Sequence, residues 1–102
     1  MTTITADEVK FRLDSGEKLH LVDVREPHEN IEFNIGGQLV PLGKVQTMQI
    51  DEIDNLKNEE VIVYCRSGNR SGQAALMLET FGFTDVKNLT GGMLAWKERF
   101  GG

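Results

Sequence analysis

Cysteine, proline and long apolar runs are all scarce in this chain. Its 102 residues contain one cysteine and two prolines. A single cysteine cannot form an internal disulfide, which excludes a small secreted scaffold held together by disulfides. No apolar run approaches the roughly 20 residues of a membrane-spanning helix, and the N-terminal residues lack the pattern of a signal peptide. We therefore expect a cytoplasmic protein.

Basic residues are also few. Eleven Lys and Arg stand against 16 Asp and Glu, so the formal net charge is −5 at pH 7. This balance argues against a nucleic-acid partner, because such a surface needs a basic face. The apolar fraction of 39% is typical of a globular protein. The length suffices for one core, so we expect one domain over residues 1–102.

Short apolar runs alternate with helix-like segments along the chain. The predicted strands are 19–24, 38–41, 61–64 and 86–89. Five helical segments are predicted. The first follows a capping-box pattern at Thr5–Glu8, the second starts at Pro27, and the third covers 45–56 with a break near Asp51. The fourth runs from about Arg70 to Gly82, and the last follows Gly91-Gly92. This alternation predicts an α/β fold around a mainly parallel sheet. Ligands of such sheets bind at the carboxyl ends of the strands, where Arg25 and Cys65 lie.

The only cysteine, Cys65, lies at a charged turn between a predicted strand and a predicted helix. A thiol at a helix start lies beside unpaired N–H groups and the positive end of the helix dipole. Together with Arg66 and Arg70, these groups favour the thiolate and lower its pKa. A small packing cysteine is the alternative, but packing gains nothing from two flanking arginines. The local positive charge in an acidic protein predicts an anionic ligand.

Three motifs in order resemble the single-domain form of the rhodanese family. They are Leu21–Glu26, Cys65–Ser71, and Gly91-Gly92-Met93 with Trp96. The likeness covers nearly the whole chain and implies a rhodanese-like α/β domain with helices on both faces of the sheet. It departs from the family at Asn34–Gln38, where many members have Gly-His-Ile. That difference makes the rim of the site, and so the partner, harder to predict.

The resemblance implies a sulfurtransferase in which Cys65 carries a sulfane sulfur as a persulfide. The loop residues Arg66, Ser67, Gly68, Asn69 and Arg70 would form the cradle and bind the substrate. The N–H groups of residues 67–71 form an anion-binding nest in this interpretation, and the two arginines bind the sulfonate of thiosulfate. A surface salt bridge is the alternative for each arginine. The donor would be thiosulfate or a persulfide, and the acceptor cyanide, a thiol or a sulfur-relay protein.

The loop length argues against a related chemistry. Cysteine-dependent phosphatases use a Cys-(x)5-Arg loop, whereas Arg70 follows Cys65 after four residues and Ser71 takes the next position. The shorter ring suits a sulfur atom better than a phosphate. Phosphatase or arsenate-reductase chemistry is thus a less favoured alternative to sulfur transfer. A non-catalytic protein-binding module is the other alternative.

Other polar residues are expected to support the site. Ser71 is interpreted as a helix cap or loop brace, and Asp23 and Arg25 either contact the active loop or brace neighbouring loops. No metal or cofactor is expected, because His20 and His28 lack a ligand partner at usable spacing. The terminal Gly101-Gly102 pair is predicted to be a frayed end.

Overall fold

A parallel sheet forms the centre of the molecule, and the computed structural model describes residues 1–101 around it. Its strands are β1 (Thr2–Ile4), β2 (His20–Asp23), β3 (Gln38–Leu39), β4 (Glu60–Tyr64) and β5 (Asp85–Leu89). They lie in the order β1-β5-β4-β2-β3, and every paired neighbour is parallel. The predicted parallel sheet is confirmed. The frayed end predicted at Gly101-Gly102 lies in part outside the described residues.

Helices follow each of the strands. They are α1 (Ala6–Asp14), α2 (Pro27–Glu32), α3 (Leu42–Gln46), the 3-10 helix η1 (Asp51–Leu56), α4 (Asn69–Thr80) and α5 (Gly92–Phe100). The predicted capping box starts α1, because the Thr5 hydroxyl accepts the Glu8 N–H at 3.1 Å and the Thr5 N–H donates to the Glu8 carboxylate. Within residues 1–101, no helix has both the length and the apolar character to cross a membrane.

The sequence analysis missed β1. This strand has only three residues, two of them exposed threonines, so it carries no alternation that could predict it. It exists because Thr2, Thr3 and Ile4 pair with β5. Tertiary pairing, rather than local pattern, therefore sets this edge of the sheet.

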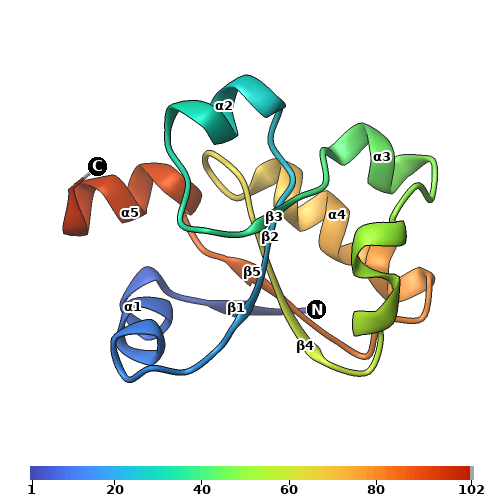
Figure 1. Ribbon diagram of the computed structural model, residues 1–102, viewed down its shortest axis with the longest axis horizontal. Helices are drawn as coiled ribbons and strands as arrows, with labels where there is room; N and C mark the ends of the chain where they lie inside the picture. The colour runs from blue at the N-terminus through green and yellow to red at the C-terminus, as the bar shows by residue number, and fades with distance from the viewer. Residues whose placement is uncertain (102) are drawn as a thin grey trace.

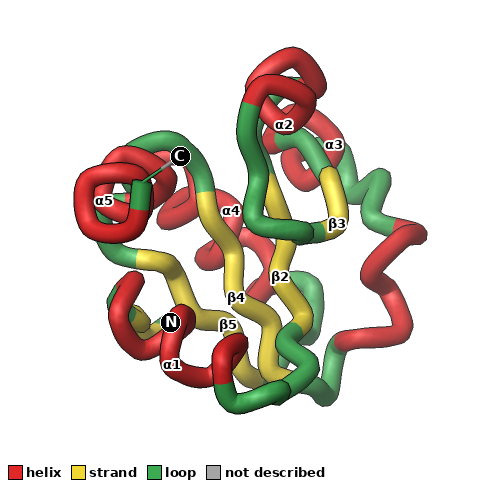
Figure 2. Tube along the Cα trace, turned by 60° about the vertical axis from the view of Figure 1, so that its left-hand side comes forward, coloured by secondary structure: helices red, strands yellow, loops and turns green. Residues whose placement is uncertain are grey.

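The central strand β4 is buried on both faces because its side chains alternate between two apolar clusters. Val61, Val63 and Cys65 belong to the cluster that contains the buried residues of α3, η1 and α4. Ile62 and Tyr64 belong to the cluster of α1 and α5. Figure 2 shows α1 and α5 on one side of the strands and α4 on the other. The predicted helices on both faces are confirmed.

The carboxyl ends of β2 and β4 lie side by side. These two strands pair in register, with Asp23 opposite Tyr64. The loops that begin at Val24 and Cys65 therefore leave the sheet at the same edge. In Figure 1 the yellow cysteine loop, α2 and the start of α5 gather at this end of the molecule.

Candidate active site

The Cys65 sulfur is surrounded by hydrogen-bond donors from the start of α4. Cys65 is only 1% exposed. Its Sγ lies 3.1 Å from the Gly68 nitrogen and 3.3 Å from the Ser71 nitrogen, and both N–H groups donate to it. The Ser71 hydroxyl is also 3.3 Å from Sγ. The predicted nest is therefore present at Gly68 and Ser71, which point their amides at one sulfur atom.

These donors change the acidity of the thiol. Burial by itself raises the pKa of Cys65, because it penalises the charged form. The Ser71 hydroxyl and the amides of Ser71, Gly68 and Ser67 outweigh burial and hold the pKa of Cys65 below its ordinary value. The direction agrees with the sequence prediction, but the dominant favourable groups are neutral dipoles rather than the two arginines.

Gly68 makes the tight loop possible. Its φ of +107° lies in the left-handed region that glycine adopts at little cost, and it is the residue that caps α4. Its carbonyl accepts the Gly72 N–H at 3.0 Å, the first hydrogen bond of the helix. The chain can thus turn back and direct the Gly68 and Ser71 N–H groups at Cys65.

Arg70 forms an ion pair with α2. Its guanidinium donates to both carboxylate oxygens of Glu29, at 2.7 and 2.9 Å. This bidentate geometry is the stronger form of an arginine–carboxylate contact. The salt bridge that was predicted as the alternative for Arg70 is therefore formed, and it links the start of α4 to α2. Donor binding by Arg70 stays a prediction.

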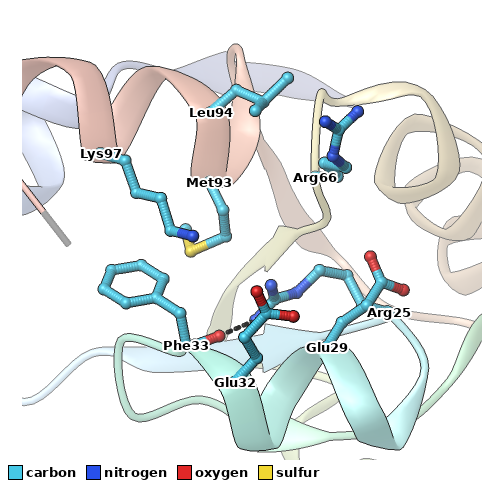
Figure 3. A pocket seen from close by; sticks show the side chains of 8 residues that line it. All are labelled: Arg25, Glu29, Glu32, Phe33, Arg66, Met93, Leu94 and Lys97. Carbon is cyan, nitrogen blue, oxygen red and sulfur yellow. Dashed lines mark hydrogen bonds between the residues drawn. The ribbon is translucent and has the colours of Figure 1, made fainter.

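Arg66 is exposed and lines a small cavity beside the loop. The cavity measures about 100 Å³. Figure 3 shows its lining residues: Arg25, Glu29, Glu32, Phe33, Arg66, Met93, Leu94 and Lys97. Lys97 lies over the Phe33 ring, with its Nζ 4.8 Å from the ring centroid. The cavity lining combines cationic, acidic and apolar side chains, and it includes Arg66, which directly follows Cys65. Lys97 is a lining residue that was not predicted from the sequence.

Asp23 and Arg25 form a buried ion pair at the end of β2. Asp23 is fully buried and Arg25 is 4% exposed. The Arg25 Nε and Nη2 atoms donate to the two carboxylate oxygens of Asp23, each at 2.9 Å, and Nη2 also donates to the Phe33 carbonyl at 2.5 Å. The Asn30 carboxamide donates to Asp23 at 2.9 Å. These contacts support the interpretation of the pair as a loop brace, while Arg25 also lines the cavity beside Arg66.

The start of α5 covers the cysteine from the other side, a contact that sequence reasoning did not predict. The Met93 N–H donates to the Cys65 carbonyl at 2.9 Å, and the Leu94 N–H donates to the Arg66 carbonyl at 3.0 Å. Gly92 has a φ of +55°, and a Cβ there would overlap the Cys65 carbonyl oxygen. The Gly91-Gly92 pair was the available signal, because adjacent glycines often mark a close backbone approach.

Asn88 is the second residue that the sequence analysis missed. It lies on β5, and its carboxamide contacts both Gly68 and Ser71 of the cysteine loop. A polar residue inside the run Val86–Leu89 was the only available signal. Among residues 1–101, no group of three or more His, Cys, Asp or Glu side chains is arranged to hold a metal ion.

Comparison with solved structures supports the fold. A rhodanese-like domain protein from Staphylococcus aureus superimposes with a TM-score of 0.83 at 33% identity, covering 94% of this chain and 91% of that one. The human single-domain sulfurtransferase TSTD1 superimposes with a TM-score of 0.80, covering 97% of each chain. Because its sequence identity is only 23%, this second match supports the fold alone.

Several curated relatives carry sulfurtransferase names. A sulfurtransferase of Allochromatium vinosum is 37% identical over 91% of this chain and 85% of its own length. The Mycobacterium tuberculosis protein named "Probable adenylyltransferase/sulfurtransferase MoeZ" is 36% identical over 96% of this chain, which spans only 25% of that protein. The sequence model of the rhodanese-like domain matches residues 5–99. The chain therefore belongs to the rhodanese-like domain family.

Proposed function

We propose that the protein is a sulfurtransferase that carries a sulfane sulfur on Cys65. The observation that supports this proposal is the set of donors around the Cys65 Sγ, which receives the amides of Gly68 and Ser71 and lies beside the Ser71 hydroxyl. Such an environment favours a thiolate, which is the nucleophilic form of cysteine. It also offers the same dipoles to the negative sulfur of a persulfide.

The reaction has two balanced steps. In the first, the Cys65 thiolate attacks the sulfane sulfur of thiosulfate, a Sγ–S bond forms, the S–S bond of thiosulfate breaks, and sulfite leaves with the electron pair. In the second, cyanide or an acceptor thiolate attacks the outer sulfur, the persulfide bond breaks, and the Cys65 thiolate returns. The chain has no second cysteine, so the sulfur leaves to an external acceptor.

Arg66 is the residue best placed to meet an anionic donor. It is exposed, follows Cys65 directly and lines the cavity beside the loop, whereas the Arg70 guanidinium is held by Glu29. We propose that Arg66 contacts the sulfonate of thiosulfate, with Ser67, Gly68, Asn69 and Arg70 completing the loop. A persulfide donor and a thiol or sulfur-relay protein as acceptor fit the same site. A cytoplasmic location stays a prediction.

The loop geometry favours sulfur over phosphate as the cargo. The Gly68 and Ser71 amides converge on the cysteine sulfur itself, which is 1% exposed. A phosphatase loop needs its amides and its arginine around a bound phosphate next to the cysteine. Here the Arg70 guanidinium is paired with Glu29.

The mass of the intact protein tests the proposal. After exposure to thiosulfate, the wild type should gain one sulfur atom, and cyanide should remove it with release of thiocyanate. Cys65→Ser should show neither event, because a serine hydroxyl is not ionised near neutral pH. Since Cys65 is the only cysteine, the added mass has a single assignment.

A variant that moves the thiol provides the matched control. The double substitution Cys65→Ser and Ser67→Cys keeps one thiol in the same loop but places it at an exposed position. We expect this variant to form no cyanide-labile persulfide, because its sulfur lies outside the contacts of Gly68 and Ser71. Turnover of thiosulfate in Cys65→Ser alone would refute the proposed function.

A further inference from the structure

The side chain of Asn88 joins β5 to two residues that contact the Cys65 sulfur. Its Nδ2 donates to the Gly68 carbonyl at 3.1 Å, and its Oδ1 accepts the Ser71 hydroxyl at 2.5 Å. Gly68 and Ser71 are the residues whose amides reach the Cys65 Sγ. Asn88 does not hydrogen-bond to the Cys65 sulfur, so any effect of Asn88 on Cys65 must act through Gly68 and Ser71.

The carboxamide of Asn88 can have only one orientation here. The Gly68 carbonyl is an acceptor and already receives the Gly72 N–H at 3.0 Å, so the Asn88 group that faces it must be the NH₂. The Oδ1 atom of Asn88 then faces Ser71, as the short contact requires. The contact with Gly68 thus ensures that Asn88 turns its carboxamide oxygen toward Ser71.

The Ser71 hydroxyl has one hydrogen and two acceptors. Asn88 Oδ1 lies 2.5 Å from its oxygen, and Cys65 Sγ lies 3.3 Å from it. When Cys65 is a neutral thiol, the Ser71 hydroxyl donates its hydrogen bond to Asn88 Oδ1, and the serine oxygen can accept a hydrogen bond from the S–H group. When Cys65 ionises, the thiolate becomes the stronger acceptor and competes for that hydrogen.

We propose that Asn88 is a positioning residue for the reactive sulfur, because it ties the Gly68 carbonyl to β5 and controls which acceptor receives the Ser71 hydrogen. This inference deepens the proposed function, on which it rests for its relevance to sulfur transfer. The neutral carboxamide suits both tasks: its NH₂ group donates to Gly68, and its uncharged oxygen is a weaker acceptor for the Ser71 hydrogen than a thiolate is.

The charged groups around the loop are largely engaged with one another. Arg70 of α4 is paired with Glu29 of α2, and Arg25 beyond β2 is paired with Asp23. Arg66 is exposed at the rim. The Asn88–Ser71–Cys65 chain is therefore a neutral path to the sulfur, and a negative charge at position 88 would be a large change in its surroundings.

Asn88→Asp provides the test, because it keeps the shape of the side chain. An aspartate cannot donate to Gly68, holds the Ser71 hydrogen more strongly, and places a negative charge near the sulfur. All three effects disfavour the thiolate. We expect the Cys65 pKa, measured as the alkylation rate against pH, to rise by about one unit, which is about tenfold less thiolate below the pKa. Asn55→Asp, at an exposed position of η1, adds the same charge elsewhere and should titrate like the wild type.

If Asn88→Asp does not fold, NMR spectroscopy of the wild-type protein provides a second test. The side-chain amide NMR signals of Asn88 should shift with the midpoint of the Cys65 titration, while those of Asn55 should not. Cys65→Ser should remove the shift. A lower melting temperature for Asn88→Asp with an unchanged thiol titration would mean a structural role only and would overturn the proposal, as would Asn88 signals that do not titrate.

These measurements are independent of sulfur transfer. A protein that forms no persulfide but shows the shifted titration would refute the proposed function and retain the role of Asn88 in controlling the thiol. A protein that transfers sulfur with the same thiol titration in wild type and Asn88→Asp would retain the function and refute the role of Asn88.

Discussion

The loops after β2 and β4 leave the sheet at the same edge but use their polar groups in opposite ways. The loop after β2 directs the Asp23 carboxylate and the Arg25 guanidinium at each other in a buried pair. The loop after β4 directs backbone amides of Gly68 and Ser71 at the Cys65 sulfur. One loop encloses full charges that satisfy each other, and the other surrounds a titratable sulfur with neutral dipoles.

The two arrangements have different chemical consequences. A buried ion pair stays in place because separating its members leaves an unpaired charge. Neutral dipoles that point at a sulfur atom stabilise its thiolate, which is the nucleophilic form of cysteine. The Arg70–Glu29 pair joins α4, which follows the cysteine loop, to α2, which follows the loop after β2.

Breaking the pair in the loop after β2 should have the largest effect. Asp23→Asn removes the charge opposite Arg25, and loss of one partner of a buried ion pair typically costs about 3 kcal/mol or more. We expect a decrease of that size in the free energy of unfolding, measured in urea. Arg99→Gln, which breaks the exposed pair with Asp7, should cost about 1 kcal/mol or less. Equal costs for the two variants would contradict the rigid role assigned to Asp23.

Adding a methyl group at Gly92 should damage the loop after β4. The Cβ of Gly92→Ala would overlap the Cys65 carbonyl oxygen, and a φ of +55° is strained for alanine. We expect a loss of about 2 kcal/mol in stability together with reduced persulfide formation. Gly43→Ala on α3, where a Cβ meets no atom within 4 Å, is the control and should be neutral or slightly stabilising. A fully active, fully stable Gly92→Ala would show that α5 does not need to approach the cysteine so closely.

Removing the Ser71 hydroxyl should change acidity more than stability. A hydrogen bond to a charged group contributes about 1.5–3 kcal/mol, so Ser71→Ala should raise the Cys65 pKa by about one unit. Ser67→Ala removes an exposed hydroxyl from the same loop and should leave the titration unchanged. The alkylation rate against pH reports both variants. Coinciding curves for Ser71→Ala and wild type would leave the amides as the sole activating groups.

Removing the Arg70–Glu29 ion pair should have the smallest effect on stability, and this effect should depend on pH. The hydrogen bonds from Arg70 lower the pKa of Glu29 to about 2 from its usual 4.5. A carboxyl with a lowered pKa contributes stability above pH 4.5 and loses it as the pH falls toward 2. Glu29→Gln should therefore cost about 1 kcal/mol or less at neutral pH and weaken the decline in stability between pH 4.5 and 2. An unchanged acid profile, followed by thermal unfolding, would show that the loops are not coupled through this pair.

Local sequence patterns predicted most of the fold and the location of the candidate site. The capping box at Thr5–Glu8 marked the start of α1, and the apolar run at 61–64 marked β4 with Cys65 at its end. These predictions succeeded because hydrophobic periodicity and helix caps are local properties. The strand β1 was missed because its three residues form a strand only through pairing with β5.

The groups that act on the sulfur were predicted less well. The sequence predicted that loop N–H groups, the helix dipole, Arg66 and Arg70 together favour the thiolate. The N–H groups are confirmed, but the Ser71 and Gly68 donors, rather than the arginines, dominate the lowering of the Cys65 pKa. The partner of Arg70 is Glu29, which is 41 positions away in the chain. A flexible arginine reaches whichever carboxylate the fold brings near it, and sequence spacing carries no information about that choice.

Local sequence was enough to predict the parallel α/β architecture, the turn at Cys65 and the glycine that lets this turn close. Each of these depends on the period of apolar residues or on the backbone freedom of one residue, and both are properties of short segments. Three contacts arise from the folded arrangement: Asn88 accepts from Ser71, the Met93 amide donates to the Cys65 carbonyl, and Arg70 binds Glu29. Those contacts join segments that are distant in the chain, so they form only when the strands align and place the ends of β2, β4 and β5 at one edge.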